Sequence, residues 1–246
     1  MTGQLLLRGM IVGLIAGLLA FGFARVFGEP WVEAGIAFEE QEAKKTGAPA
    51  EPEMFSRATQ SGPGLLTASL AYSVAIGGLF ALTFAFAYGR IGHLSPRLTA
   101  SALSFAGFVS VIGAPFLKYP ANPPGVGISE TIGMRTEFFF VMIVASVVGM
   151  VLAFMLARNL AARFGTWGGI GAAVLAYIAF IAVIQALLPS VNEVPEDFSA
   201  AALWNFRAAT LGMHVIVWGV LGQLFGWLAE RLLIKQGSYR PASLAR

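Results

Sequence analysis

Acidic side chains are concentrated on three of the segments that separate the apolar runs of this sequence. Twelve of the 13 acidic residues lie within residues 28–64, 118–137 and 189–208. Carboxylates gathered at the mouth of a pore raise the local concentration of cations. The pattern therefore favours a surface that attracts cations, with an ordinary solvated acidic loop as the alternative for residues 28–64.

Proline and asparagine shape two of these segments. Residues 113–127 hold Asn122 among prolines and glycines, and residues 188–198 hold Asn192 between two prolines. Proline fixes φ and stiffens the chain. Both segments are therefore expected to be shaped loops that offer amide and carboxylate oxygens.

Several kinds of chemistry are excluded by composition. The chain has no cysteine and only two histidines, which excludes disulfides, Cys nucleophiles and metal sites built only from His or rich in Cys. No hydrolase, kinase or phosphate-loop motif is present. His214 is the one ionisable imidazole inside an apolar run, either bonded to a carbonyl or hydroxyl or acting as a metal ligand. We predict that the protein is not an enzyme.

The elements that position these groups are apolar runs long enough to cross a bilayer as helices. The six runs lie at residues 9–27, 65–88, 98–117, 138–157, 168–188 and 209–229. With 57% hydrophobic and 12% charged residues, the chain leaves no room for a separate soluble domain. The predicted fold class is all-α, a polytopic membrane bundle of about six transmembrane helices in one domain, residues 1–246.

Basic residues orient the predicted helices. The N-terminus, the second and fourth connections and the C-terminal tail hold nine basic residues and one acidic residue, whereas the three acidic segments, together with Arg25 just before the first, hold seven basic residues. By the positive-inside rule both termini face the cytoplasm, and residues 28–64, 118–137 and 189–208 form the outer loops. The net charge of +3 without a basic patch gives no signal for nucleic acid.

Small residues and proline predict local features of the helices. Glycines recur at four-residue spacing in the first apolar run at Gly9, Gly13 and Gly17, and in the last at Gly222 and Gly226. We expect tight helix contacts at both places, because glycine lets two backbones approach closely. Pro115 is expected to kink or loosen the third helix, and residues 31–45 can form a short surface helix.

Three arginines on the outer side run against the positive-inside tendency, so we expect something to hold them there. They are Arg57, Arg135 and Arg207, each close to a threonine. The expected partners are Glu130, Glu137 or Glu193. Such pairs would lock the outer loops over a central vestibule and would make the arginines structural. The alternative is that the arginines snorkel to lipid headgroups.

One run of residues is too specific to be an accident of composition. Residues 117–127 read Leu-Lys-Tyr-Pro-Ala-Asn-Pro-Pro-Gly-Val-Gly, and residues 55–60, 135–136, 192–195 and 203–207 add further matches. On these segments the chain resembles the CbtA family, predicted cobalt transporter subunits linked to cobalamin. The resemblance implies cobalt uptake across the cytoplasmic membrane of a bacterium, with CbtB as a small single-helix partner bearing a histidine-rich end. Family descriptions count five spans, against six apolar runs here.

Cobalt(II) accepts imidazole, carboxylate, amide oxygen and water as ligands. For a cobalt cargo, the candidate metal ligands are Asn122, Glu130, Glu137, Asn192, Glu193 and His214. No tightly bound cofactor is expected. The expected partners are the lipid bilayer, the CbtB-like protein and, in a homo-oligomer, further copies of the chain.

Two other classes of protein stay open. A non-transporting structural or assembly subunit would explain the lack of charged side chains within the apolar runs, and it would have no continuous polar path. A membrane-embedded enzyme using Arg135, Glu137 and His214 would need a lipid-accessible cleft, and the missing nucleophile argues against it.

Overall fold

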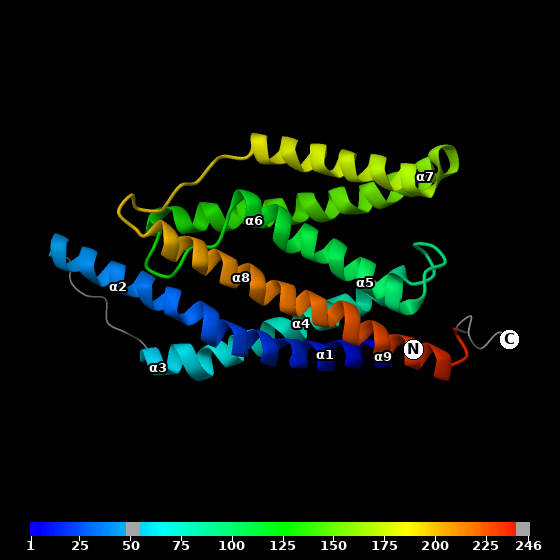
Figure 1. The fold of residues 1–246 in the computed structure, drawn as a ribbon, viewed down its shortest axis with the longest axis horizontal. Coiled ribbons are helices and arrows are strands. Elements are labelled where there is room, and N and C mark those ends of the chain that lie inside the picture. Colours follow the sequence, from blue (N-terminus) through cyan, green and yellow to red (C-terminus); the bar gives the residue numbers. More distant parts are fainter. Residues whose placement is uncertain (48–54, 240–246) are drawn as a thin grey trace. The chain divides into compact units, whose positions relative to one another are not determined.

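The computed structural model describes residues 1–47 and 55–239, and every regular element within them is a helix (Figure 1). The elements are α1 Thr2–Phe23, η1 Ala24–Gly28, α2 Glu29–Thr46, α3 Arg57–Thr59, η2 Gln60–Gly64, α4 Leu65–Ala87, α5 Pro96–Gly107, η3 Phe108–Gly113, α6 Ala114–Lys118, η4 Ser129–Thr131, α7 Ile132–Leu187, α8 Ala200–Val220, η5 Leu221–Phe225 and α9 Gly226–Lys235. The all-α prediction is confirmed for these residues. Glu51, Glu53, Arg240 and Arg246, which entered the charge count, lie outside them.

Five helices of the described chain are long and apolar enough to cross a membrane. They are residues 2–46, 57–87, 96–118, 132–187 and 200–235. The fourth contains 56 residues, and as one straight helix it would measure about 84 Å, far more than a bilayer core of about 30 Å. The number of times that the chain crosses the membrane therefore depends on how α7 is arranged.

A break at Gly165 folds α7 into two antiparallel arms (Figure 1). Gly165 has φ 71° and ψ 168°, a left-handed conformation that glycine adopts without steric cost. The arms contact each other where the hydroxyls of Ser146 and Tyr177 are 2.7 Å apart. The predicted spans 138–157 and 168–188 occupy one arm each. The count of six spans and the orientation of both termini stay predictions.

The chain divides into two compact units. Unit 1 comprises residues 1–105 and 200–246, and unit 2 comprises residues 106–199. Each is described by itself below, and the expectation of a single membrane domain stays a prediction.

Glycine lets α1 and α4 meet backbone to backbone in unit 1. A Cβ added at Gly9 would lie 2.3 Å from the carbonyl oxygen of Gly77, and one at Gly13 would lie 2.2 Å from that of Ser73. Gly17 meets Ser69 in the same way. Because no real side chain fits at such distances, the predicted tight contact of the first helix is confirmed.

The second predicted glycine contact also occurs in unit 1. An added Cβ at Gly222 would lie 2.9 Å from the Cβ of Ser104, and one at Gly226 would lie 3.0 Å from that of Ala100. The Ser104 hydroxyl donates a hydrogen bond to the carbonyl oxygen of Trp218 beside this contact. Helix α5 therefore packs closely on η5 and α9.

The helices extend into segments that were predicted as outer loops. Residues 31–45 are helical as expected, but α2 continues from α1 through the π-helical turn η1 and is not a separate surface helix. Helix α8 begins at Ala200, well before the predicted span starts at residue 209. At the third helix, the loosening expected at Pro115 is present as the π-helical turn η3, which directly precedes α6.

Candidate functional site

One buried carboxylate joins three segments of unit 2. Glu193 as a whole residue is 4% exposed, and its Oε1 accepts a hydrogen bond from the Thr131 hydroxyl at 2.6 Å. Its Oε2 pairs with the Arg135 guanidinium at 3.0 Å. Arg135 also donates a hydrogen bond to the carbonyl oxygen of Pro120. We call Thr131, Arg135, Glu193 and Pro120 the loop lock, because they tie the start of α7 to the two proline-rich loops.

A second set of hydrogen bonds holds the same two loops together. The Tyr119 hydroxyl donates to the carbonyl oxygen of Pro189 at 2.7 Å, and the Lys118 ammonium donates to the Ser190 hydroxyl at 3.0 Å. Burial raises the pKa of Tyr119, so the phenol stays protonated and remains a donor. The shaped loops expected from their proline content are therefore fixed by side chains as well.

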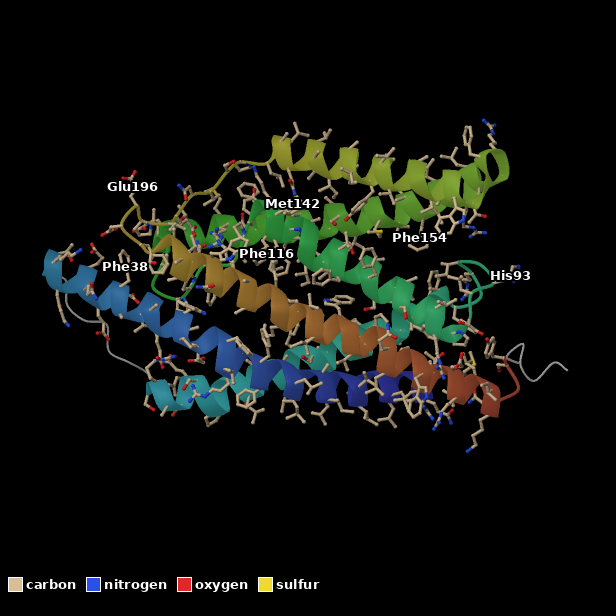
Figure 2. All side chains as sticks on the ribbon, in the orientation of Figure 1. Phe38, His93, Phe116, Met142, Phe154 and Glu196 are labelled. Carbon is tan, nitrogen blue, oxygen red and sulfur yellow. The ribbon has the colours of Figure 1, made fainter. Side chains whose placement is uncertain are left out.

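An apolar core of unit 2 packs against these loops. Ala114, Tyr119, Met142 and Ile181 are buried together in unit 2, and Met142, labelled in Figure 2, belongs to the first arm of α7. Tyr119 thus contributes its ring to this core and its hydroxyl to the loop contact. The loop geometry rests on the packing of the α7 arms against α6.

The other predicted ligands of unit 2 are not part of the loop lock. Glu130, Glu137 and Asn192 are exposed, and Asn122 is half-buried. Glu137 follows Arg135 by two residues, which is about 200° around the helix, so it lies on the other side of α7. Within residues 1–47 and 55–239, no three His, Asp or Glu side chains gather in a group that could hold a metal ion.

The outer arginines have different partners. Arg135 pairs with Glu193, one of the three expected carboxylates. Arg57 pairs with Glu29 at 2.6 Å, and the expectation that Arg57 pairs with Glu130, Glu137 or Glu193 is wrong. Arg207 lies on α8, where it is half-buried.

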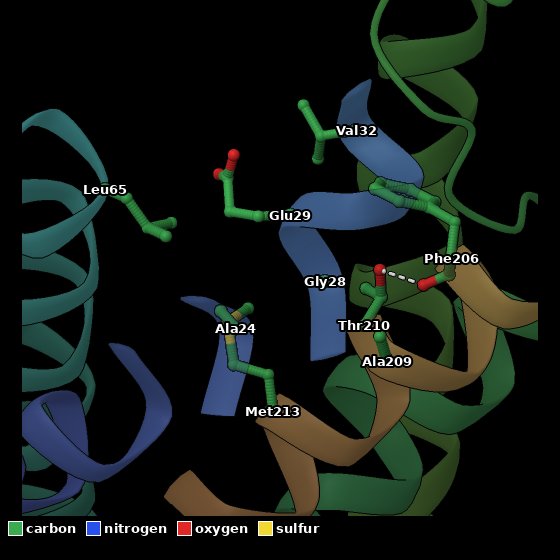
Figure 3. Close-up of a pocket in the computed structure, with 9 residues that line it drawn as sticks. All are labelled: Ala24, Gly28, Glu29, Val32, Leu65, Phe206, Ala209, Thr210 and Met213. Carbon is green, nitrogen blue, oxygen red and sulfur yellow. Dashed lines mark hydrogen bonds between the residues drawn. The ribbon is translucent and has the colours of Figure 1, made fainter. Parts of the chain in front are cut away.

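A pocket of unit 1 adjoins the Glu29 carboxylate. It is lined by Ala24, Gly28, Glu29, Val32, Leu65, Phe206, Ala209, Thr210 and Met213 (Figure 3). The Thr210 hydroxyl donates to the carbonyl oxygen of Phe206 at 2.9 Å. Sequence reasoning did not single out Glu29; the available signal was an acid placed directly at the end of the first apolar run and followed by Pro30.

His214 lies on α8 and belongs to unit 1, whereas the other five predicted ligands belong to unit 2. Its ring meets that of Tyr72 edge-on, with 5.8 Å between the centroids. Among the described residues its buried Nδ1 has no hydrogen-bond partner, so the expected bond to a carbonyl or hydroxyl is not present at this nitrogen.

These features define a class: over the described residues the chain is an all-helical, multi-pass membrane protein. The family model of the probable cobalt transporter subunit (CbtA) matches residues 2–230. The chain belongs to the CbtA family. Neither a curated protein nor a solved structure matches the chain. The description of the family gives cobalt transport as the probable role of its members. A transporter subunit is not a class of enzyme.

Proposed function

We propose that this chain is the membrane subunit of a cobalt(II) uptake system and that the cation enters through an acidic outer vestibule. The observation that carries the proposal is the arrangement of unit 2. A buried lock fixes two proline-rich loops, while Glu130 and Glu137 remain exposed beside it on the same stretch of chain.

The acidic residues of unit 2 divide into two roles. Glu193 uses both carboxylate oxygens within the protein, so its role is to hold the loops. Glu130 and Glu137 are not needed to hold the loops, and both are exposed. Attraction of a cation acts over roughly 8 Å at physiological salt, so it needs exposed charge rather than a closed set of ligands.

The proposal includes a topology and a partner. Counting the two arms of α7 separately gives six spans, with both termini in the cytoplasm of a bacterium and the loop lock on the outer face of the inner membrane. This chain has only two histidines. A CbtB-like single-helix protein with a histidine-rich end would supply further imidazole ligands for the metal. The imported cobalt would serve cobalamin synthesis.

The proposal is tested by the initial rate of Co²⁺ uptake in cells that produce the chain with its partner. The double variant Glu130→Gln/Glu137→Gln keeps side-chain shape and removes two charges, so uptake at low Co²⁺ should fall several-fold. Glu39→Gln/Glu40→Gln is the matched control, since it removes two exposed charges from α2. Uptake by the control should stay near that of the wild type.

Ionic strength supplies a second arm of the same experiment. If attraction by exposed carboxylates is the mechanism, added salt should lower wild-type uptake toward that of the Glu130→Gln/Glu137→Gln variant. Unchanged uptake kinetics in that variant would exclude these two carboxylates. No cobalt accumulation by the wild type with its partner would favour the structural or assembly subunit.

A further inference from the structure

The ends of α1, α4, α5 and α9 in unit 1 bring together basic side chains that are scattered in the sequence. The amide of Gln236, directly after α9, donates to Gln4 Oε1 of α1 at 2.7 Å (Figure 1). The rings of Phe84 in α4 and Phe225 in η5 meet edge-on, with 5.2 Å between their centroids. Residues 1–10, 88–99 and 226–239 at these ends hold one acidic side chain, Glu230, and five basic ones, which we call the basic end: Arg8, Arg90, Arg97, Arg231 and Lys235. The fold thus forms a basic patch that no single stretch of the sequence shows.

The one acidic side chain among these residues is bound to a partner on α5. Glu230 pairs with Arg97 at 2.5 Å, and its side chain is 14% exposed. Arg231 and Lys235 follow it in α9, where both are exposed. Because they are four residues apart, they are neighbours on one face of the helix, and like charges at this spacing repel. An anion bound to both would therefore stabilise the end of α9.

An aromatic ring positions the Arg231 guanidinium. The guanidinium carbon lies 3.9 Å from the centroid of the Trp227 ring, one turn earlier in α9. Arg90 is arranged in the same way, 5.0 Å from the centroid of the Phe86 ring. A cation–π contact uses one face of the guanidinium, and the N–H donors lie at its edge. Such a planar fork matches two oxygens of a phosphate group.

The predicted spans place the basic end at the depth of lipid headgroups. The last apolar run ends at residue 229. Arg231 and Lys235 follow by about 3 Å and 9 Å along a helix, and each headgroup layer is about 5 to 7 Å thick. Exposed apolar side chains adjoin the basic ones, with Leu7 next to Arg8, Phe86 at Arg90 and Leu98 next to Arg97. An occupant with an anionic head and apolar tails fits this surface better than a free anion does.

We propose that Arg231 and Lys235 bind the phosphate of an anionic phospholipid and that Trp227 holds the Arg231 guanidinium in place. The other three members of the basic end add positive potential, and the acyl chains lie along exposed apolar side chains of the helices. Each base near a membrane surface contributes separately, so the loss of one should weaken binding about fivefold. The site needs neither cobalt nor a particular orientation of the chain, so its test is separate from that of the proposed function.

The first test is the binding of phosphatidylglycerol to the purified full-length chain in neutral detergent, measured by native mass spectrometry. Arg231→Gln/Lys235→Gln removes two bases, so the affinity should fall about tenfold or more. Arg25→Gln/Lys44→Gln is the matched control, because it removes two exposed bases from η1 and α2, beyond the other end of α1. Its affinity should equal that of the wild type. Equal losses in the two variants would show attraction by net charge alone and would overturn the site.

The second test compares Tm values in nanodiscs of phosphatidylcholine and of equal parts phosphatidylcholine and phosphatidylglycerol. The wild type and the control variant should gain Tm from phosphatidylglycerol, whereas Arg231→Gln/Lys235→Gln should gain little. In phosphatidylcholine alone this variant should unfold near the wild-type Tm, since both side chains are exposed. An equal loss of Tm in both bilayers would mean a purely structural role and would overturn the site. Equal Tm values of the wild type in both bilayers would overturn it too, and would favour an acidic protein segment as the occupant.

Inorganic phosphate distinguishes a lipid from a free anion. At millimolar concentration it should leave the binding of phosphatidylglycerol unchanged, because it has no acyl chains. Displacement of the lipid by phosphate would assign the site to a free anion and would overturn the proposal. Wild-type affinity for phosphatidylglycerol in a chain that takes up no Co²⁺ would support the lipid site and contradict the proposed function alone.

Discussion

Arg135 and Glu193 lie 58 residues apart in the sequence and meet at 3.0 Å in unit 2. The pair is largely removed from solvent, with 20% of the arginine side chain and 2% of the glutamate side chain exposed. Arg135 holds the start of α7, and Glu193 holds the loop that follows it. Because Arg135 also donates to the carbonyl oxygen of Pro120, this one side chain connects both proline-rich loops to α7.

Removal of Arg135 should destabilise the protein strongly. Arg135→Ala leaves the buried Glu193 carboxylate without its cation, which costs on the order of 3 to 5 kcal/mol. The measurement is the thermal unfolding and the yield of folded protein in detergent. Arg135→Ala/Glu193→Gln should recover part of the loss, because no unpaired charge is then buried. Wild-type yield and Tm in Arg135→Ala would instead favour an arginine that only contacts headgroups.

The Tyr119 hydroxyl should make the stability of the folded protein fall at alkaline pH. Burial raises the pKa of Tyr119 above its ordinary value of 10.0, so its contribution is complete below about pH 10 and is lost as pH rises through the folded-state pKa. Tyr119→Phe removes the bond to Pro189 and should cost about 1 kcal/mol. It should also show a smaller loss of stability at high pH than the wild type. Parallel pH profiles of Tm would contradict this role.

The α1–α4 contact should reject even a methyl group. Gly13→Ala places a Cβ against the backbone of Ser73, so we expect a loss of about 1 to 3 kcal/mol despite the better helix propensity of alanine. Gly22→Ala is the control, since nothing lies within 4 Å of its added Cβ. Tm values of both variants give the comparison, and equal values would show that the helices do not pack this tightly.

The α7 arms should return the chain to the same side of the membrane. Since the chain has no cysteine, single introduced cysteines report their side cleanly. Ile128→Cys and Asn192→Cys should both react with an impermeant reagent from outside, whereas Phe164→Cys should react only after the membrane is opened. Labelling of Ile128→Cys and Asn192→Cys from opposite sides would mean that α7 crosses once.

Local packing was predictable where a single residue type determines it. Gly9, Gly13 and Gly17 indicated a close helix contact because only glycine permits one, and the structure supplied α4 as the partner. The pairing of Arg135 with an outer carboxylate was expected for a related reason, since a charge near a helix start needs a partner. Which of three glutamates would be that partner depended on tertiary structure.

The missed features depend on chain geometry that hydropathy does not record. The apolar run ends near residue 27. The alanines and glutamates of the following segment, residues 29–46, favour a helix, so α1 continues through η1 into α2. That continuation places Glu29 in a buried position, where it meets Arg57 across 28 residues of sequence. A single sequence gives no signal for such a distant pair.

Co²⁺ influx into proteoliposomes that contain this chain and the proposed single-helix partner is the most direct test of cobalt transport through the acidic face of unit 2. We expect influx that saturates with Co²⁺, that weakens with added salt, and that falls several-fold in Glu130→Gln/Glu137→Gln but not in Glu39→Gln/Glu40→Gln. Vesicles whose Co²⁺ influx equals that of protein-free vesicles, with the chain folded and correctly oriented, would contradict it.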